Sequence, residues 1–306
     1  MFKSNTSRYL RAISASVALL VATSNTPALA ADLEVVATGL HFPEGVIFVG
    51  NTLYFVDYAS SDVLRIAHGK VEQVWHQAGC GANGLAEVRG EILVACYDSG
   101  TIVGITSDGK FVETIDHDEA NGGFVHPNDL AVDSAGGVYF SGSGDASTPG
   151  KIYYLGPSGH VNMVASGISY ANGLVVSNDG KILYVAESEK DRLITFEIAA
   201  GGRLSGEAEF AKLDDILADG QHSAFIPDGV RIDKHGRLFV GLYEGGGFAV
   251  LSGQGQLIKK VNLPSAHHSN LAIAPDGKSI FVTTADDTLD GSYRGEMFKV
   301  DNPVSE

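Results

Sequence analysis

The prediction of the fold rests on residues Pro227–Leu242, PDGVRIDKHGRLFVGL. An apolar-rich segment runs through Val230 and Ile232, a polar tip with a glycine follows, and the chain returns through Leu238-Phe239-Val240. This pattern predicts a β-hairpin. An acidic residue, Asp228, stands at the start of the hairpin, directly before a glycine.

The same pattern recurs along the chain. Its other copies are EGVIFVGNTLYFVDYAS from Glu44, NGLAEVRGEILVACYDSG from Asn83, PNDLAVDSAGGVYFSGS from Pro127, NGLVVSNDGKILYVAES from Asn172 and NLAIAPDGKSIFVTTAD from Asn270. The starts at positions 44, 83, 128, 172, 228 and 270 are 39, 45, 44, 56 and 42 residues apart. A second hairpin follows each opening one, so each repeat supplies four strands. The period predicts an all-β protein, a six-bladed β-propeller.

The segment before the first repeat, residues 33–40 (LEVVATGL), reads as a lone strand. We expect it to complete the last blade and to close the ring, because closure protects the free sheet edges. The longest interval, 172 to 228, contains residues 214–218, for which we expect a short helical turn. Residues 31–306 are therefore predicted to form a single propeller domain.

The first thirty residues have the features of a cleaved secretory signal. Lys3, Arg8 and Arg11 precede an apolar run of roughly a dozen residues, and Ala28-Leu29-Ala30 suits a signal peptidase. The run is shorter than the ~20 residues that span a bilayer. We expect export to the periplasm or beyond the cell, and no membrane span in the mature chain.

The formal net charge is −16, and cleavage after residue 30 removes three basic residues and no acidic one. Such a surface excludes nucleic acid as an expected partner. We expect a small-molecule substrate and a monomeric protein.

The first strand of each propeller blade lines the central axis, so the residues at the repeat starts should form a ring. Each member offers oxygen: Glu44, Asn83, Asn128, Asn172, Asp228 and Asn270. Hard oxygen ligands suit Ca²⁺, with Mg²⁺, Mn²⁺ or Zn²⁺ as alternatives. A partly open divalent site polarises a carbonyl, and a neighbouring carboxylate acts as base or nucleophile. The alternative is that Asn-Gly and Asp-Gly merely favour turns.

At these residues the chain resembles the regucalcin and gluconolactonase family of six-bladed propellers, which is related in fold to diisopropyl fluorophosphatase and the paraoxonases. The motifs are FPEGVIF from Phe42, PND around Asn128, NGL with NDGKILYVAES from Asn172, PDG with GRLFVG around Asp228, and SNLAIAPDGKSIFVTTA from Ser269. The resemblance implies one divalent cation held by Glu44, Asn172 and Asp228, with Asn128 at the metal or the substrate. It also implies lactone hydrolysis, with Asp228 as base or nucleophile.

Three positions depart from the pattern of the family's sugar lactonases. Val46 replaces a common proline, His126 replaces an arginine that contacts substrate, and Phe140-Ser141-Gly142-Ser143 replaces Phe-Thr-Asp-Pro. The resemblance therefore supports metal binding more strongly than it supports a sugar lactone as substrate. We expect His126, Asn83, Asn128 and Asn270 to face the substrate. The alternatives are a non-catalytic propeller that uses the metal structurally, and a phosphotriesterase-like hydrolase.

The chain has two cysteines, Cys80 and Cys96, which flank one predicted hairpin. An exported protein permits a disulfide, which would contribute about 3 kcal/mol, and two buried thiols are the alternative.

Four histidines, at positions 126, 222, 267 and 268, precede or adjoin repeat starts. A proton-shuttling histidine is one interpretation and ordinary loop histidines are the other. His126 is the preferred candidate because it lies two residues before Asn128.

Overall fold

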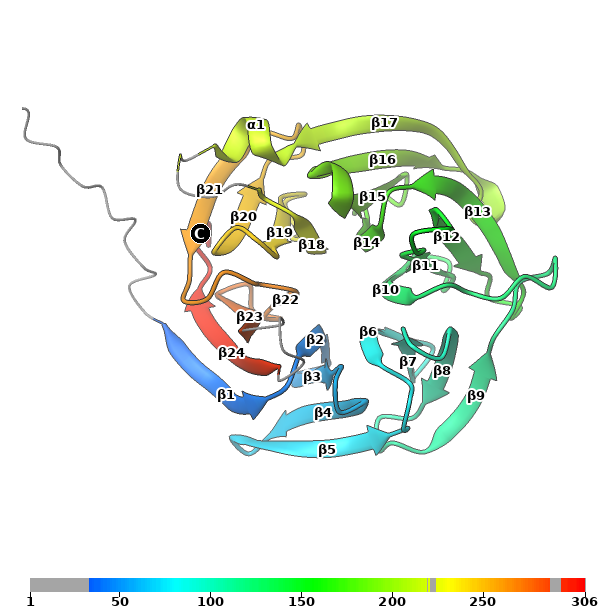
Figure 1. Ribbon diagram of the computed structural model, residues 1–306, viewed down its shortest axis with the longest axis horizontal. Coiled ribbons are helices and arrows are strands. Elements are labelled where there is room, and N and C mark those ends of the chain that lie inside the picture. Colours follow the sequence, from blue (N-terminus) through cyan, green and yellow to red (C-terminus); the bar gives the residue numbers. More distant parts are fainter. Residues whose placement is uncertain (1–32, 219, 221–223, 287–292, 306) are drawn as a thin grey trace, which may run out of the picture.

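The computed structural model describes residues 33–305, except residues 219, 221–223 and 287–292. These residues form six four-stranded antiparallel sheets arranged as a ring (Figure 1), which confirms the predicted six-bladed propeller. The predicted signal segment and His222 lie outside the described residues.

The first three blades use strands that follow one another along the chain. Blade 1 contains β2 (Pro43–Val49), β3 (Thr52–Asp57), β4 (Asp62–Ala67) and β5 (Lys70–His76). Blade 2 contains β6 (Ala82–Val88), β7 (Glu91–Cys96), β8 (Thr101–Ile105) and β9 (Phe111–Ile115). Blade 3 contains β10 (Pro127–Val132), β11 (Val138–Gly142), β12 (Gly150–Leu155) and β13 (Val161–Ile168).

Blades 4 and 5 are built in the same way, whereas blade 6 combines both ends of the propeller. Blade 4 contains β14 (Ala171–Val176), β15 (Ile182–Glu187), β16 (Arg192–Ile198) and β17 (Leu204–Lys212). Blade 5 contains β18 (Pro227–Ile232), β19 (Leu238–Leu242), β20 (Gly247–Leu251) and β21 (Leu257–Asn262). Blade 6 contains β22 (Leu271–Ile273), β23 (Ser279–Asp286), β24 (Arg294–Asp301) and β1 (Glu34–Leu40).

The first strand of each blade lies next to the axis, and the last lies at the rim (Figure 1). Because successive strands pair with one another in sequence order, this arrangement follows from hairpins alone. It brings residues at the starts of all six repeats to the central channel.

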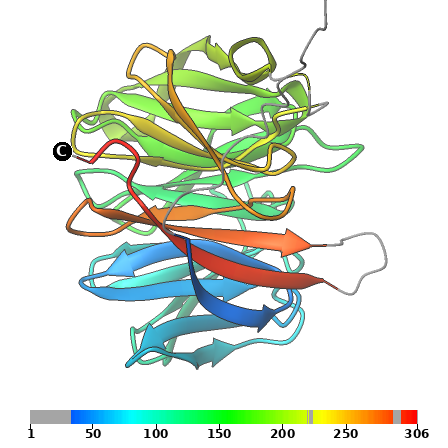
Figure 2. The ribbon, with the colours of Figure 1, turned by 90° about the vertical axis from the view of Figure 1, so that its left-hand side faces the viewer.

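The N-terminal strand closes the ring, as predicted. β1 pairs antiparallel with β24, with Glu34 opposite Lys299 and Leu40 opposite Gly295, and the two strands lie side by side in Figure 2. Ala37 and Leu40 are buried in the apolar cluster between blades 6 and 1. The first strand is therefore tied to the last by both backbone pairing and apolar packing.

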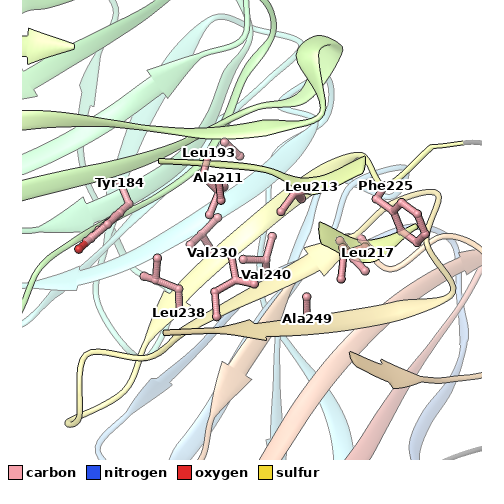
Figure 3. Close-up of a cluster of buried hydrophobic side chains, with 13 residues drawn as sticks. Tyr184, Leu193, Ala211, Leu213, Leu217, Phe225, Val230, Leu238, Val240 and Ala249 are labelled. Atoms are coloured by element: carbon pink, nitrogen blue, oxygen red, sulfur yellow. The ribbon is translucent and has the colours of Figure 1, made fainter. Parts of the chain in front are cut away.

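The apolar cores lie between blades. In the described part of the chain, six clusters of buried apolar side chains each join two neighbouring blades. Figure 3 shows the one between blades 4 and 5, where Leu193 faces Val230 and Val240. Each fully buried leucine contributes about 1.5–3 kcal/mol. Packing of this kind fixes the innermost strands relative to one another.

Short helical segments decorate the ring. The predicted helical turn exists as α1 (Leu213–Leu217), one residue earlier than expected, and its two leucines pack into the cluster of Figure 3. The 3₁₀ segments are η1 (Ser188–Lys190) and η2 (Ala200–Gly202). Among the described residues, no helix is long and apolar enough to cross a membrane.

The two cysteines form a disulfide, the first of the two alternatives. Cys80 precedes β6 and Cys96 ends β7, with their Cα atoms 4.6 Å apart. The bond therefore anchors the loop that leads into the channel at Asn83.

Candidate functional site

Five of the six predicted ring residues line one cavity at the end of the channel. Its volume is about 420 Å³, and Glu44, Asn83, Asn128, Asn172 and Asp228 contribute to its wall. Four of them are almost fully buried, with exposed fractions of 4% for Glu44, 7% for Asn128, 6% for Asn172 and 7% for Asp228. The structure thus brings together the two carboxylates and two amides that the sequence singled out.

A strand irregularity recurs where these side chains enter the channel. The pairing register of the first strand shifts between Glu44 and Ile47 in blade 1, and at the matching place in blades 2 to 5. A β-bulge re-aims side chains locally. In blades 2 to 5 the shift spans the ring residue, and in blade 1 it begins at Glu44, so an irregularity accompanies the channel-facing position in all five blades.

The glycine after a ring residue is required because the backbone of the next blade approaches it closely, not because the chain turns there. A Cβ atom on Gly84 would lie 2.2 Å from the carbonyl oxygen of Asn128, and one on Gly173 would lie 2.1 Å from that of Asp228. Both glycines lie within strands. The turn interpretation of these dipeptides is therefore wrong: glycine lets the innermost strands of neighbouring blades come together.

Serine hydroxyls hold the ring residues from the neighbouring blade. Ser188 Oγ donates to the carbonyl of Pro227, 2.7 Å away, just before Asp228. Ser143 Oγ donates in the same way to the carbonyl of Ala171, at 2.9 Å. The Ser143 departure from the family pattern thus has a structural role. Each bond fixes the backbone next to a channel-facing side chain.

Asn172 presents an unsatisfied oxygen to the site. Its Nδ2 donates to Ser188 Oγ at 3.2 Å, which defines the orientation of the amide. Its Oδ1 is buried and has no hydrogen-bond partner among the described residues. A buried acceptor left unpaired costs about 1–3 kcal/mol. An oxygen held in this way beside Glu44 and Asp228 fits a cation, so the donor set suits the implied metal.

Burial and neighbouring negative charges disfavour the ionised forms of the two carboxyl groups of the site. Burial raises the pKa of Glu44 to about 8, and the negative charge of Asp129 adds to this effect. Burial also raises the pKa of Asp228 well above its usual range, and the charges of Glu44 and Asp129 contribute further. The Asn172 amide and the Arg231 charge oppose that rise. A cation between the carboxylates would favour their ionised forms.

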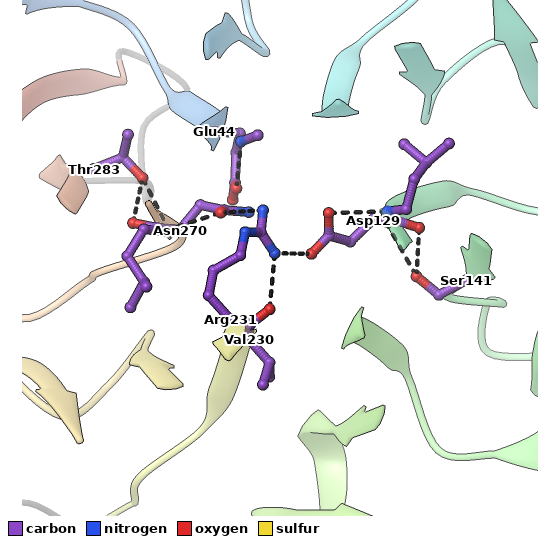
Figure 4. Close-up of polar contacts among 10 residues, drawn as sticks. Glu44, Asp129, Ser141, Val230, Arg231, Asn270 and Thr283 are labelled. Atoms are coloured by element: carbon purple, nitrogen blue, oxygen red, sulfur yellow. Dashed lines mark hydrogen bonds and ion pairs between the residues drawn. The ribbon is translucent and has the colours of Figure 1, made fainter. Parts of the chain in front are cut away.

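Below the ring lies a buried ion pair that the sequence reading missed. Arg231 Nη1 donates to Asp129 Oδ2 at 2.9 Å, and Nη2 donates to Asn270 Oδ1 at 2.8 Å (Figure 4). The Asp129 side chain is 1% exposed and that of Arg231 is 17% exposed. Two signals could have revealed the pair. Asp129 stands where four other blades have glycine, and Arg231 is a charge within an apolar innermost strand.

Two predicted substrate residues lie apart from the cavity that Glu44 lines. Asn270 is buried, and its Oδ1 accepts from both Arg231 and the Leu271 N–H, at 2.8 and 2.9 Å. His126 lines an adjoining cavity of about 500 Å³, and its Nδ1 lies 2.9 Å from the carbonyl oxygen of Gly144. Its ring stacks on Tyr97, with centroids 4.3 Å apart. Tyr97 lines both cavities, so His126 flanks the site through that ring.

Of the four candidate histidines, His267 and His268 do not line this cavity either. His268 is fully buried, and burial lowers its pKa to about 4, so it is neutral at pH 7. The His267 ring lies against Tyr243, with centroids 4.7 Å apart, and its Nδ1 lies 3.1 Å from the Tyr243 carbonyl oxygen. In the described part of the chain, no three His, Cys, Asp or Glu side chains form a metal cluster. Any metal at the ring would therefore rely on the amide oxygens.

The comparisons with known proteins identify the family of the chain. The sequence profile of the SMP-30/Gluconolactonase/LRE-like region matches residues 42–286. The chain belongs to this family. A gluconolactonase of Zymomonas mobilis is 25% identical over 287 residues, which cover 83% of this chain and 79% of the relative. Human regucalcin is 28% identical over 271 residues, which cover 82% and 87%.

Solved structures show the same fold at lower identity. A gluconolactonase from Xanthomonas campestris superposes with a TM-score of 0.72 at 22% identity, covering 87% of this chain and 88% of the other. A calcium-binding regucalcin from Agrobacterium tumefaciens superposes with a TM-score of 0.69 at 18% identity, covering 87% and 92%. At these identities the likeness establishes the propeller architecture for this family member.

Proposed function

We propose that this protein is a lactonase-like hydrolase that opens a lactone or a related ester at a divalent cation site. The unpaired Oδ1 of Asn172, buried beside two carboxyls whose ionised forms are disfavoured in a substrate-sized cavity, is the observation that carries the proposal. The names of family relatives support the reaction class, since they include gluconolactonase, pentonolactonase and lactonase.

Glu44, Asn128, Asn172 and Asp228 are the residues that would hold the cation. Ca²⁺ is the expected ion, because the donors are hard oxygens and a structural relative is described as a calcium-binding regucalcin. Mg²⁺, Mn²⁺ and Zn²⁺ remain alternatives. A divalent ion bound there would polarise the carbonyl of the substrate as a Lewis acid.

Asp228 is the proposed catalytic residue. In the general-base form, it takes a proton from water as the water oxygen attacks the carbonyl carbon. The ring C–O bond then breaks, the proton passes to the departing alkoxide, and the product is a hydroxy acid. In the nucleophilic form, the carboxylate itself attacks and water releases the acyl group. Both forms require ionised Asp228, which the Arg231 charge and the Asn172 amide favour.

The replacement Asp228→Asn tests the assignment. We expect turnover of a lactone panel to fall by at least ~10²-fold, the usual contribution of a positioned acid–base group. Thermal melting should show a folded protein, because the change removes a carboxyl whose ionisation is opposed by burial. Full activity in this variant contradicts the assignment. A wild type that binds a divalent cation but turns over no lactone, ester or phosphoester would instead be a non-catalytic propeller.

We further propose that the protein is exported and acts as a monomer. The basic start, the apolar run and Ala28-Leu29-Ala30 support export. The Cys80–Cys96 disulfide also supports it, because such bonds persist in oxidising compartments.

A further inference from the structure

Aromatic and aliphatic side chains form the outer wall of the cavity above the ring. Three of them lie two residues before a ring residue: Phe42, Tyr170 and Ile226. The other three directly follow the second strand of a blade: Tyr58, Tyr97 and Tyr243. All six are partly exposed, whereas the carboxylates and amides of the floor, apart from Asn83, are buried. We call the five aromatic residues among them the aromatic belt.

The rings of the belt contact one another in a continuous series. Tyr97 lies edge-on to Tyr58 with centroids 5.9 Å apart, and Tyr58 lies edge-on to Phe42 at 5.8 Å. Phe42 stacks with Tyr243 at 6.4 Å. Aromatic pairs in these geometries stabilise one another by about 0.5–1.5 kcal/mol each. The wall is therefore a preorganised apolar surface that joins blades 1, 2 and 5.

Three of the tyrosine hydroxyls are already engaged. Tyr58 Oη donates to Asp98 Oδ1 at 2.9 Å, and the hydroxyls of Tyr97 and Tyr170 are hydrogen-bonded at 3.1 Å. Burial raises the pKa of the Tyr58 and Tyr97 phenols above the usual value, so they stay neutral. No lysine, arginine or histidine is among the described residues that line this cavity. A ligand against the belt thus meets ring faces, and the charged side chain outside the floor among the described lining residues is the exposed Glu189.

The backbone of Tyr170 is in a conformation that is rare for a non-glycine residue. Its φ is 59°, and His126, at the matching position of blade 3, has a φ of 53°. Such a conformation costs of order 1–3 kcal/mol and persists where the surroundings specify it. Here it accompanies the Tyr97–Tyr170 hydroxyl bond and the Tyr97–His126 stacking. The placement of these rings is therefore specified by the fold.

These observations discriminate between classes of lactone. When a polyhydroxylated sugar lactone binds, each hydroxyl loses hydrogen bonds to water and needs a partner in the protein. Each polar group buried without a partner costs about 1–3 kcal/mol. An apolar substituent gains about 25 cal/mol for each Å² removed from water. The neutral belt favours the second kind of ligand. Apart from the exposed Glu189, the ionisable carboxyl groups and the amides that line the cavity belong to the floor, where the ester group would react.

Resting on the proposed function, we propose that the substrate is a lactone or ester bearing an apolar ring or chain, which the aromatic belt binds, rather than a sugar lactone. The test compares kcat/KM for γ-phenyl-γ-butyrolactone and D-glucono-1,5-lactone. We expect wild type to prefer the phenyl compound at least tenfold. Equal or reversed preference overturns the proposal.

Variants in the aromatic belt test whether these residues cause the preference for the phenyl lactone. Tyr97→Gln should lower it at least tenfold, through a higher KM for the phenyl lactone, whereas Tyr97→Phe, which keeps the ring, should retain it. Phe111→Gln is the control, because Phe111 is a 61% exposed aromatic residue of the same blade, on its outer strand. Tyr58→Gln repeats the test at the matching position of blade 1 if Tyr97→Gln does not fold. Equal losses for both lactones contradict a role in specificity.

A binding measurement separates this proposal from that of catalysis. The unreactive lactams 5-phenyl-2-pyrrolidinone and D-glucono-1,5-lactam replace the two lactones in calorimetric titrations of wild type and Tyr97→Gln. If wild type prefers the phenyl lactam and Tyr97→Gln abolishes this preference, the result supports the aromatic belt as the binding surface. This holds even if no lactone is hydrolysed, and in that case only the hydrolase proposal fails. Equal binding of both lactams, or no binding of the phenyl lactam, overturns the proposed ligand class.

Discussion

The guanidinium of Arg231 lies 2.9 Å from the Asp129 carboxylate in the central channel, although the two residues are 102 positions apart in sequence. Two buried carboxyl groups interact with this guanidinium: Asp129 through the ion pair and Asp228 through the charge of Arg231. Figure 4 shows Arg231 between Asp129 and Asn270, with Glu44 pointing toward the contact with Asn270. Arg231 therefore offsets part of the negative charge at the floor of the site.

Removal of Arg231 alone should destabilise the fold. A buried ion pair broken on one side typically costs about 3–5 kcal/mol, because the remaining charge stays buried without its partner. We expect this loss for Arg231→Met in chemical denaturation of the chelated protein. The double variant Arg231→Met/Asp129→Asn should recover most of it. As a control, Arg65→Met removes an exposed ion pair with Glu72 and should change little.

A small effect of Arg231→Met, within about 1 kcal/mol of wild type, would contradict this account. So would a double variant as unstable as the single one. Either result would mean that the channel carboxyls are protonated or hydrated without need of the guanidinium.

Ser188 should control the metal site through the Asn172 amide. In Ser188→Ala, Asn172 Nδ2 loses the acceptor that orients it, so we expect divalent-cation affinity to fall about tenfold, in the range for residues that orient metal ligands. Ser143→Ala is the matched control, because Ser143 makes the same bond to the next blade one repeat earlier. Both variants should lose about 1 kcal/mol of stability. Equal cation affinities in the two variants would contradict the orienting role of Ser188.

His268 should make the fold sensitive to acid. Its folded pKa is lowered by burial from 6.5 to about 4, so the unfolded state takes up a proton first as the pH falls. The unfolding free energy is therefore unaffected by the protonation of His268 above about pH 6.5. It decreases by about 3 kcal/mol as the pH falls toward 4. As the pH falls across this range, the unfolding free energy of wild type should decrease by about that amount relative to that of His268→Leu. Parallel pH profiles would contradict the prediction.

The fold and most of the ring could be predicted from the sequence for a physical reason. Hairpin periodicity and a blade-length repeat are local signals, and propeller topology brings equivalent positions to one axis. Glu44, Asn128, Asn172 and Asp228 are therefore found by comparing repeat starts. Their cavity needed no long-range information beyond the symmetry of the ring.

The missed features depend on contacts between repeats. Asp129 and Arg231 matter as a pair, and only the closed ring brings them together. Asn270 occupies a repeat start, yet Arg231 binds it because blade 5 alone has an arginine at that place in its innermost strand. The aromatic belt uses different residue types in different blades, so no repeated motif marks it. Comparison of two positions across the blades would have revealed it: the one two residues before each ring residue and the one directly after each second strand.

The most direct test of the metal site is a calorimetric titration of chelated protein with Ca²⁺. We predict one cation bound per chain by wild type, and affinity at least tenfold weaker in Glu44→Gln, which removes a charged ligand. Glu189→Gln is the control, because Glu189 borders the same cavity but is exposed and is not a proposed ligand. It should bind much as wild type does. No bound cation, or equal binding by wild type and Glu44→Gln, would contradict the claim that this ring of oxygens is a metal site.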